Sequence, residues 1–171
     1  MAFERGGYAD KLGNRYEDRW VVKQLLRLLD EEIKAITIEP IGDDERGVDL
    51  IVEQKDGKKQ YQQCKARNGS KEFWSVADLN SKGILAAIQF QLDRALNHEY
   101  ALITAIPATL FGDICQSARD SNGNPYDYYT KQIKLQGQEP QITFNKFCEY
   151  LNLNPEFPED LAIAFRYLQN T

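Results

Sequence analysis

The feature that most constrains this chain is a pair of alternating segments, residues 47–54 (GVDLIVEQ) and 58–66 (KKQYQQCKA), joined by Asp56-Gly57. Alternation of apolar and polar residues with a period of two is typical of strands. An Asp-Gly pair between two such segments favours a tight hairpin. The sequence therefore predicts at least one antiparallel strand pair.

The hairpin lies within an alternation of helical and extended segments. Helical periodicity covers residues 14–32, 75–97 with an interruption near Gly83, 107–118, 143–151 and 158–169, and extended segments cover 35–39 and 99–105. A hairpin is antiparallel, whereas a helical crossover favours a parallel return. We therefore expect an α/β fold with a mixed central sheet that is flanked by helices on both faces.

The length of 171 residues fits one domain, with a core at about residues 8–105 and a C-terminal helical extension at about 106–171. The last helix reaches Thr171 without a stop signal, so we expect the domain to be part of a larger protein. No apolar run approaches the roughly 20 residues of a spanning helix, and the first residues (MAFERGGYADK) lack the apolar stretch that is typical of a signal peptide. A cytoplasmic location without a membrane partner is expected.

The single histidine restricts the chemistry. His98 alone cannot form a His-rich zinc site, and its place between a helix and a strand predicts a helix-capping role rather than a catalytic base. The three cysteines are never paired in a CxxC pattern, which speaks against a disulfide framework or a zinc knuckle. Hydrolytic chemistry would then depend on carboxylates, lysine and a metal.

The length of the hairpin loop decides which side chains share a face. A two-residue loop pairs Asp49 with Cys64, whereas a three-residue loop, residues 55–57, pairs Asp49 with Gln63. We expect the three-residue loop, a type I turn that ends in a left-handed glycine. Asp49 and Gln63 then share a face with Lys65. The apolar positions of the first strand, on the opposite face, are Val48, Leu50 and Val52.

One face of the hairpin is thus expected to carry the groups that phosphodiester hydrolysis requires. Asp49 offers an anionic oxygen and Gln63 an amide oxygen, which are ligands for a hard cation such as Mg²⁺ or Mn²⁺. Lys65 would stabilise or help deprotonate the attacking water. Asp49 and Lys65 are expected at the rim, where alanine substitutions change the melting temperature by only a few degrees. A chance match and an edge-strand role for Lys65 are the alternatives.

Glu17 is a further candidate on the first helix. On the helical wheel it lies between Trp20 and Leu28, at the edge of the apolar face. A carboxylate in that position needs a partner or a metal. Stabilisation by the dipole of the helix is the alternative explanation.

These residues resemble the PD-(D/E)xK, or restriction-endonuclease-like, nuclease superfamily. The matching segments are residues 14–17 (NRYE), 47–52 (GVDLIV) and 62–65 (QQCK), within about the first 105 residues. The form with glutamine in place of the usual acid is closest to the Mrr-type branch. It is also similar to the N-terminal nuclease domains of bacterial anti-phage defence effectors.

The resemblance implies a restriction-endonuclease-like sheet and assigns a role to each matched residue. Glu17 and Asp49 would be metal-associated acids, Gln63 the variant ligand and Lys65 the catalytic lysine. Because Gln63 carries no charge, weak metal binding or an inactive domain is left open.

Three basic residues after the hairpin, Arg67, Lys71 and Lys82, are candidates for phosphate contacts, with residues 68–70 (NGS) as an approach loop. The alternative is a solvated loop. A nucleic-acid path along Tyr126, Tyr128 and Tyr129 is a weaker hypothesis.

The function expected from the joint pattern is a Mg²⁺- or Mn²⁺-dependent endonuclease for double-stranded DNA, acting as the effector domain of a bacterial defence protein. Its partners would be DNA and the other domains of that protein, with a homo-oligomer left open. The alternatives are a catalytically inactive nuclease-like binding or assembly domain, and an RNA-cleaving enzyme with the same site. The net charge of −5 argues mildly against a surface that binds nucleic acid all over.

Overall fold

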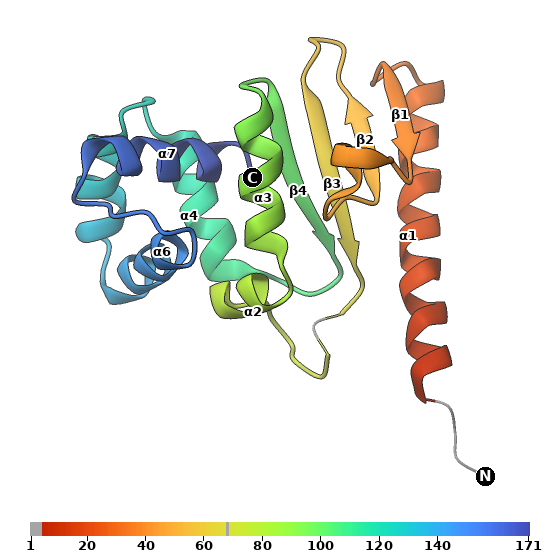
Figure 1. Ribbon diagram of the computed structural model, residues 1–171, viewed down its shortest axis with the longest axis horizontal. Coiled ribbons are helices and arrows are strands. Elements are labelled where there is room, and N and C mark those ends of the chain that lie inside the picture. The colour runs from red at the N-terminus through yellow and green to blue at the C-terminus, as the bar shows by residue number, and fades with distance from the viewer. Residues whose placement is uncertain (1–4, 68) are drawn as a thin grey trace.

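The computed structural model describes the backbone of residues 5–67 and 69–171 and the side chains of residues 15–67 and 69–171. The side chain of Asn14, in the NRYE segment, and Asn68, in the loop after the hairpin, lie outside these ranges. Within them the chain folds as a mixed four-stranded sheet with helices on both faces (Figure 1).

The sheet has the strand order β1-β2-β3-β4. Its strands are β1 (Ala35–Ile38), β2 (Leu50–Glu53), β3 (Lys59–Lys65) and β4 (His98–Thr104). β2 is antiparallel to both β1 and β3, whereas β4 is parallel to β3. The parallel return follows from the crossover through α2 (Val76–Ser81) and α3 (Ile84–Arg94), which the sequence predicts with a break at Gly83. The prediction of a mixed sheet is confirmed.

The hairpin between β2 and β3 has the predicted three-residue loop. Leu50 pairs with Gln62, and Gln54 N–H donates to the Lys58 carbonyl at 2.8 Å, which leaves residues 55–57 as the loop. Gly57 closes it in the left-handed region with φ of +85°. A residue with a Cβ is disfavoured there, so the Asp-Gly pair fixes the register of the two strands.

Helix α1 (Arg5–Leu29) covers one face of the sheet and begins earlier than the predicted residue 14. Its indole Trp20 Nε1–H donates to Gln62 Oε1 on β3 at 2.7 Å. Beneath it lies a small apolar cluster: Ile33, Leu50 and Val52, with Trp20, Val21, Leu28 and Ile36 packed against them. The alternation of β2 and β3 thus sends one set of side chains toward α1.

The opposite face carries the main core. Tyr61 and Tyr100 are buried there in one cluster that continues into the C-terminal helices. These helices are α4 (Thr109–Asp120), α6 (Gln138–Tyr150) and α7 (Pro158–Gln169). The chain end also covers the edge of β4, because Tyr100 N–H donates to the Asn170 carbonyl at 2.7 Å. The predicted extension after residue 106 is therefore helical and shares the core of the sheet.

Three short elements were not expected from the sequence. They are the 3-10 turn η1 (Gly42–Glu45), the single turn α5 (Pro125–Asp127) and the π-helix η2 (Tyr128–Lys134). π-Helical turns are rare, and no simple periodicity marks them in a sequence. Over the described residues, no helix combines the length and apolar character required to cross a membrane.

Two glycines near the start of β2 have positive φ but different surroundings. A Cβ built on Gly47, with φ of +65°, would lie 2.4 Å from Ala87 Cβ on α3. Gly42, with φ of +72°, has no atom within 4 Å of such a Cβ. The sheet and α3 are therefore held together at Gly47 by close approach of backbone to helix.

This contrast gives a stability prediction with a built-in control. Gly42→Ala should lower the free energy of unfolding by about 1–2 kcal/mol, the cost of a left-handed backbone for a residue with a Cβ. Gly47→Ala should lower it by about 1–3 kcal/mol more, because the added methyl overpacks the contact with Ala87. Denaturant unfolding of both variants measures the difference. Equal losses would mean that the Gly47 contact with α3 is not tight.

Candidate active site

A β-bulge sits where β2 begins. Leu50 lies opposite Gln62, and the preceding Asp49 N–H also donates to the Gln62 carbonyl, at 2.9 Å. Two residues of one strand thus oppose one residue of the other, which is the arrangement of a β-bulge. The side chain of Asp49 takes part as well, because Cys64 N–H donates to its Oδ2 at 2.7 Å.

The bulge corrects two details of the sequence prediction. The register of the hairpin is the expected one, but the ladder ends at Leu50 and Gln62, and the predicted pair of Asp49 with Gln63 is not formed. Val48 belongs to the core next to α3, whereas Leu50 faces α1. Strict alternation places these two side chains on one face, and the extra residue in the bulge separates them.

Asp49 is half-buried and lines a hollow, and it also has a structural role that the sequence did not predict. Its Oδ2 satisfies the Cys64 N–H, and Cys64 is buried. An unsatisfied buried donor costs about 1–3 kcal/mol. Asp49→Ala should therefore reduce stability as well as remove a carboxylate, and asparagine is the appropriate replacement because its side chain still accepts a hydrogen bond.

Four carboxylates surround a hollow of about 570 Å³ beside the bulge. Its acidic residues are Glu17, Glu39, Glu45 and Asp49, and the rest of its lining is Pro40, Ile41, Gly47 and Val48. Glu17 comes from α1, and the others come from the chain between β1 and β2. Two of the sequence-predicted site residues, from distant parts of the chain, thus share one concave surface.

Burial and the neighbouring charges both act on the carboxyl of Glu17. Burial raises the pKa of the Glu17 carboxyl above its ordinary value, and Asp49, Glu39 and Asp18 raise it further, in that order. The positive charge of Lys65 lowers it. Carboxylates from α1, the end of β1 and the start of β2 therefore act on one another, together with the lysine at the end of β3.

The charge of Lys65 acts on Glu17 and Cys64, but Lys65 does not line the hollow. Burial raises the pKa of the Cys64 thiol to about 12, and the negative charges of Asp49 and Glu17 raise it further, whereas Lys65 lowers it. Cys64 is thus a neutral thiol between the charged groups at neutral pH. Lys65 is partly exposed and supplies positive charge at the end of the sheet.

Gln63 is buried and does not line the hollow. It is 8% exposed, and its Oε1 lies 2.9 Å from the Tyr100 hydroxyl. The same hydroxyl lies 2.8 Å from the Gly47 carbonyl. Burial raises the pKa of Tyr100, so this hydroxyl keeps its proton. Gln63 is therefore one end of a buried network that reaches the segment leading into Asp49.

Two residues near the site have roles that the sequence did not predict. Glu39 has a positive φ of +48°, and its N–H donates to the Asp49 carbonyl at 3.0 Å. Extending the observed β1–β2 register beyond Ile38 and Leu50 places Glu39 opposite Asp49, but no feature of the sequence fixes that register. Gln91, buried on α3, donates to the carbonyls of Asp43 and Arg46 and anchors the segment before Gly47.

The donor atoms of the hollow fit a hard divalent cation. No group of three or more His, Cys, Asp or Glu side chains is arranged to hold a metal in residues 15–67 and 69–171. Mg²⁺, however, is commonly bound through one or two carboxylates, with waters completing the octahedron. Glu17 and Asp49 offer two such oxygen donors, and a cation would relieve the repulsion that raises the pKa of Glu17. A soft, thiolate-bound metal is not suited to this donor set.

The three basic residues predicted to contact phosphate have different surroundings. Arg67 is exposed just after β3, and Lys82 is exposed at the C-terminal cap of α2. Lys71 forms an ion pair with Asp78, which also caps the N-terminus of α2 with Ser75. A phosphate would have to compete with Asp78 for Lys71, whereas Arg67 and Lys82 extend into solvent.

His98 has the predicted capping role. Its Nδ1 lies 2.8 Å from the Gln91 carbonyl in the last turn of α3, and its Nε2 lies 3.4 Å from the Tyr61 hydroxyl. The imidazole is buried, in contact with the Tyr61 ring. It therefore completes the end of a helix and lies apart from the carboxylates.

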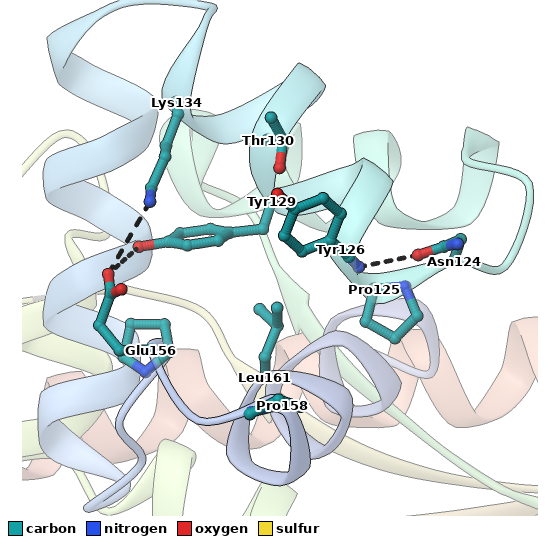
Figure 2. Close-up of a pocket in the computed structure, with 10 residues that line it drawn as sticks. Asn124, Pro125, Tyr126, Tyr129, Thr130, Lys134, Glu156, Pro158 and Leu161 are labelled. Atoms are coloured by element: carbon teal, nitrogen blue, oxygen red, sulfur yellow. Dashed lines mark hydrogen bonds and ion pairs between the residues drawn. The ribbon is translucent and has the colours of Figure 1, made fainter.

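The nucleic-acid path along three tyrosines is wrong, because Tyr128 is fully buried and donates to the Ile114 carbonyl at 2.9 Å. Tyr126 and Tyr129 instead line a separate pocket of about 380 Å³ among the C-terminal helices, shown in Figure 2. Glu156 closes one side of it, with Lys134 Nζ 3.8 Å from its Oε1. This pocket belongs to the part of the molecule on the other side of the sheet from α1 (Figure 1).

Comparison with known proteins adds no assignment. No model of a known protein family, no curated protein and no solved structure matches the chain. The function proposed below therefore rests on the residues of the site.

The raised pKa of Glu17 predicts a pH-dependent stability. When the folded-state pKa of a carboxyl lies above its unfolded value, the stability that it contributes is present at acidic pH and is lost as the pH rises through the folded pKa. Without divalent cations, Glu17→Gln should therefore be more stable than the wild type at neutral pH, and the difference should vanish in acid. Denaturant unfolding across pH measures this.

The matched control is Glu72→Gln, which removes the charge of an exposed loop carboxylate. The difference in unfolding free energy between Glu72→Gln and the wild type should not change with pH in the way expected for Glu17→Gln. A Glu17→Gln variant that is less stable than the wild type at neutral pH would mean that the other carboxylates do not repel Glu17.

Proposed function

We propose that this chain is a metal-dependent endonuclease of the PD-(D/E)xK kind, with a restriction-endonuclease-like fold. The observation that carries the proposal is the hollow that Glu17 from α1 shares with Asp49 from the start of β2, together with the charge of Lys65, at the end of β3, which acts on Glu17. These three residues match the nuclease pattern in the sequence. The element order of one helix, three strands, a helical crossover and a parallel strand agrees with it.

Electrostatics supports a requirement for a cation. A phosphodiester is an anion, and a hollow lined by Glu17, Glu39, Glu45 and Asp49 repels it. A divalent cation held by Glu17 and Asp49 would reverse the local sign of the charge. The acidic hollow is therefore consistent with a phosphodiester substrate only if a metal is bound first.

Each residue of the site then has a separate task. Bound Mg²⁺ or Mn²⁺ would polarise the scissile phosphate and neutralise developing negative charge. Asp49 is held rigidly by Cys64 N–H, so its remaining oxygen is fixed in direction for a metal. Lys65 supplies an ammonium that can stabilise negative charge or orient the attacking water. Gln63 would act through Tyr100 and Gly47 by positioning the segment that leads to Asp49.

The proposed substrate is double-stranded DNA, with phosphate contacts from Arg67 and Lys82 and, after release from Asp78, from Lys71. We propose that the domain acts in the cytoplasm as the effector of a bacterial defence protein, whose other domains bring it to DNA. With a net charge of −5, the chain itself gives little long-range attraction for nucleic acid.

One observation favours a second candidate, a nuclease-like binding or assembly domain without catalysis. Gln63 takes the place of the usual acidic ligand and is buried against Tyr100. A site that has only Glu17 and Asp49 as acids from the nuclease pattern binds a metal less tightly than one with a third carboxylate. RNA cleavage by the same residues is the remaining alternative, and the substrate assay separates the three.

The direct test is cleavage of plasmid DNA, single-stranded DNA and RNA with Mg²⁺ or Mn²⁺. We expect nicking and linearisation of the plasmid, with no cleavage when the metal is chelated. Cleavage of RNA alone would support the alternative substrate. Folded protein that cleaves none of the three would contradict the enzymatic proposal for this domain.

Substitutions in the site should separate chemistry from folding. Asp49→Asn and Lys65→Ala should each reduce cleavage by about 100-fold or more, because each removes a charge that acts on the reacting phosphate. Asp49→Asn keeps an acceptor for Cys64 N–H, so its melting temperature should stay close to that of the wild type. Lys59→Ala, at the exposed far end of β3, is the matched control and should cleave normally. A Lys65→Ala protein with wild-type activity would remove the lysine from the mechanism.

The charge count of the site gives a prediction for the metal. Gln63→Glu should tighten Mn²⁺ binding in calorimetry, because it adds a negative charge beside Gly47, which lines the hollow, and affinity for a hard cation rises with the negative charge around it. Without metal the variant should be less stable at neutral pH, since it buries a carboxylate. Gln54→Glu adds the same charge at the other end of β2 and should change neither quantity. Unchanged or weaker Mn²⁺ affinity in Gln63→Glu would show that residue 63 does not reach the metal.

A further inference from the structure

Helix α1 carries a second apolar stripe on the side away from the sheet. It consists of Val22, Leu25, Leu26 and Leu29, which are 54%, 40%, 56% and 77% exposed. Their spacing of three, one and three residues places them on one helix face. The face toward the sheet is separate and carries Trp20 and Leu28. Contiguous exposed apolar side chains of this kind mark an interaction surface.

We propose that this stripe, the outer face of α1, pairs with the outer face of a second copy of the chain, with the two helices antiparallel. A two-fold interface brings a surface against itself, so the surface must be complementary to its own rotated image. The spacing of the stripe is symmetric about the midpoint between Leu25 and Leu26. An antiparallel pair therefore places Val22 against Leu29 of the second copy, while Leu25 and Leu26 flank the two-fold axis.

The charges beside the stripe select the antiparallel arrangement. Arg19 and Asp30 are eleven residues apart, about three helical turns, so they lie on the same flank of the stripe. Neither forms an ion pair within residues 15–67 and 69–171. In the antiparallel pair, Arg19 approaches Asp30 of the second copy, and the contact occurs twice. In a parallel two-fold pair, this flank of one copy lies on the opposite side from the same flank of the second copy, so Arg19 could not reach Asp30 of the second copy.

The size of the stripe sets the strength of the pairing. Four partly exposed side chains from each copy bury less than the about 1,200–2,000 Å² of a stable interface. The dimer should therefore be weak and reversible. Glu17 lies on the sheet-facing side of α1, so the pairing leaves the acidic hollow open and does not depend on the proposed nuclease activity.

Sedimentation at concentrations from about 10 to 500 μM tests the association in the range expected for a small interface. The wild type should shift from monomer to dimer as concentration rises, and Leu26→Gln and Leu29→Gln should remain monomeric. Leu135→Gln removes an equally exposed leucine elsewhere, 76% exposed, and should dimerise as the wild type does. A wild type that is monomeric throughout, or leucine variants that dimerise unchanged, would overturn the proposal.

Cysteine cross-linking tests the direction of the helices. The native cysteines Cys64, Cys115 and Cys148 are buried, so the unmodified protein gives the background for a short thiol cross-linker. A mixture of Val22→Cys and Leu29→Cys proteins should form a covalent dimer, whereas Val22→Cys alone should not. Dimers of Val22→Cys alone, without dimers in the mixture, would indicate parallel helices and overturn the antiparallel arrangement.

A charge exchange gives an independent readout of the flank contact. Arg19→Asp and Asp30→Arg should each weaken dimerisation, because each creates a pair of like charges across the interface. The double variant restores opposite charges in the antiparallel pair and should recover dimerisation. Failure of the double variant to recover, with both single variants weakened, would place these residues outside a mutual contact.

Discussion

Two hydrogen bonds between Asp49 and β3 hold the beginning of β2 in place. Its N–H donates to the Gln62 carbonyl, and its carboxylate accepts from Cys64 N–H across β3. The resulting bulge sends Val48 to one face of the sheet while Leu50 stays on the other. The carboxylate between them is therefore held at the end of the sheet, where α1 passes and Glu17 reaches the same hollow.

Backbone contacts around the bulge hold the four carboxylates of the hollow close together, although their mutual repulsion destabilises the fold. Carboxylates that raise one another's pKa destabilise the folded chain at neutral pH, and they persist only where the surrounding backbone is strongly held. The Gln91 side chain donates to the carbonyls of Asp43 and Arg46, in the segment before Asp49. Gly47, which follows Arg46, is held by its close approach to Ala87 on α3. A cation in the hollow would relieve the same repulsion. Binding of a metal and stability of the fold are thus coupled in one place.

The sequence predicts the parts of this site that follow from periodicity and turn chemistry. Alternation and the Asp56-Gly57 turn limit the hairpin to two registers, of which the structure has the expected one. Helical spacing places Glu17 at the edge of the apolar face of α1, although spacing alone does not distinguish it from Asp18. The bulge at Asp49 is not predictable in the same way, because it leaves the pattern of residue types unchanged and depends on the fit against Cys64 N–H. Glu39 could not be placed because the long connection from β1 to β2 has no tight turn that would fix their register. The π-helix η2 lacks a periodic signal altogether.

The neutral residue at position 63 follows from the same packing. The Tyr100 hydroxyl has one proton and two neighbouring acceptors, the Gly47 carbonyl and Gln63 Oε1. An amide can accept that proton or, turned over, donate to the hydroxyl oxygen while the proton goes to Gly47. A carboxylate can only accept, and it would add a buried charge near Asp49, whose own charge already raises the pKa of Tyr100. Glutamine therefore completes the Gly47, Tyr100 and Gln63 network in either state, which gives it a structural reason to occupy this position whether or not a metal binds.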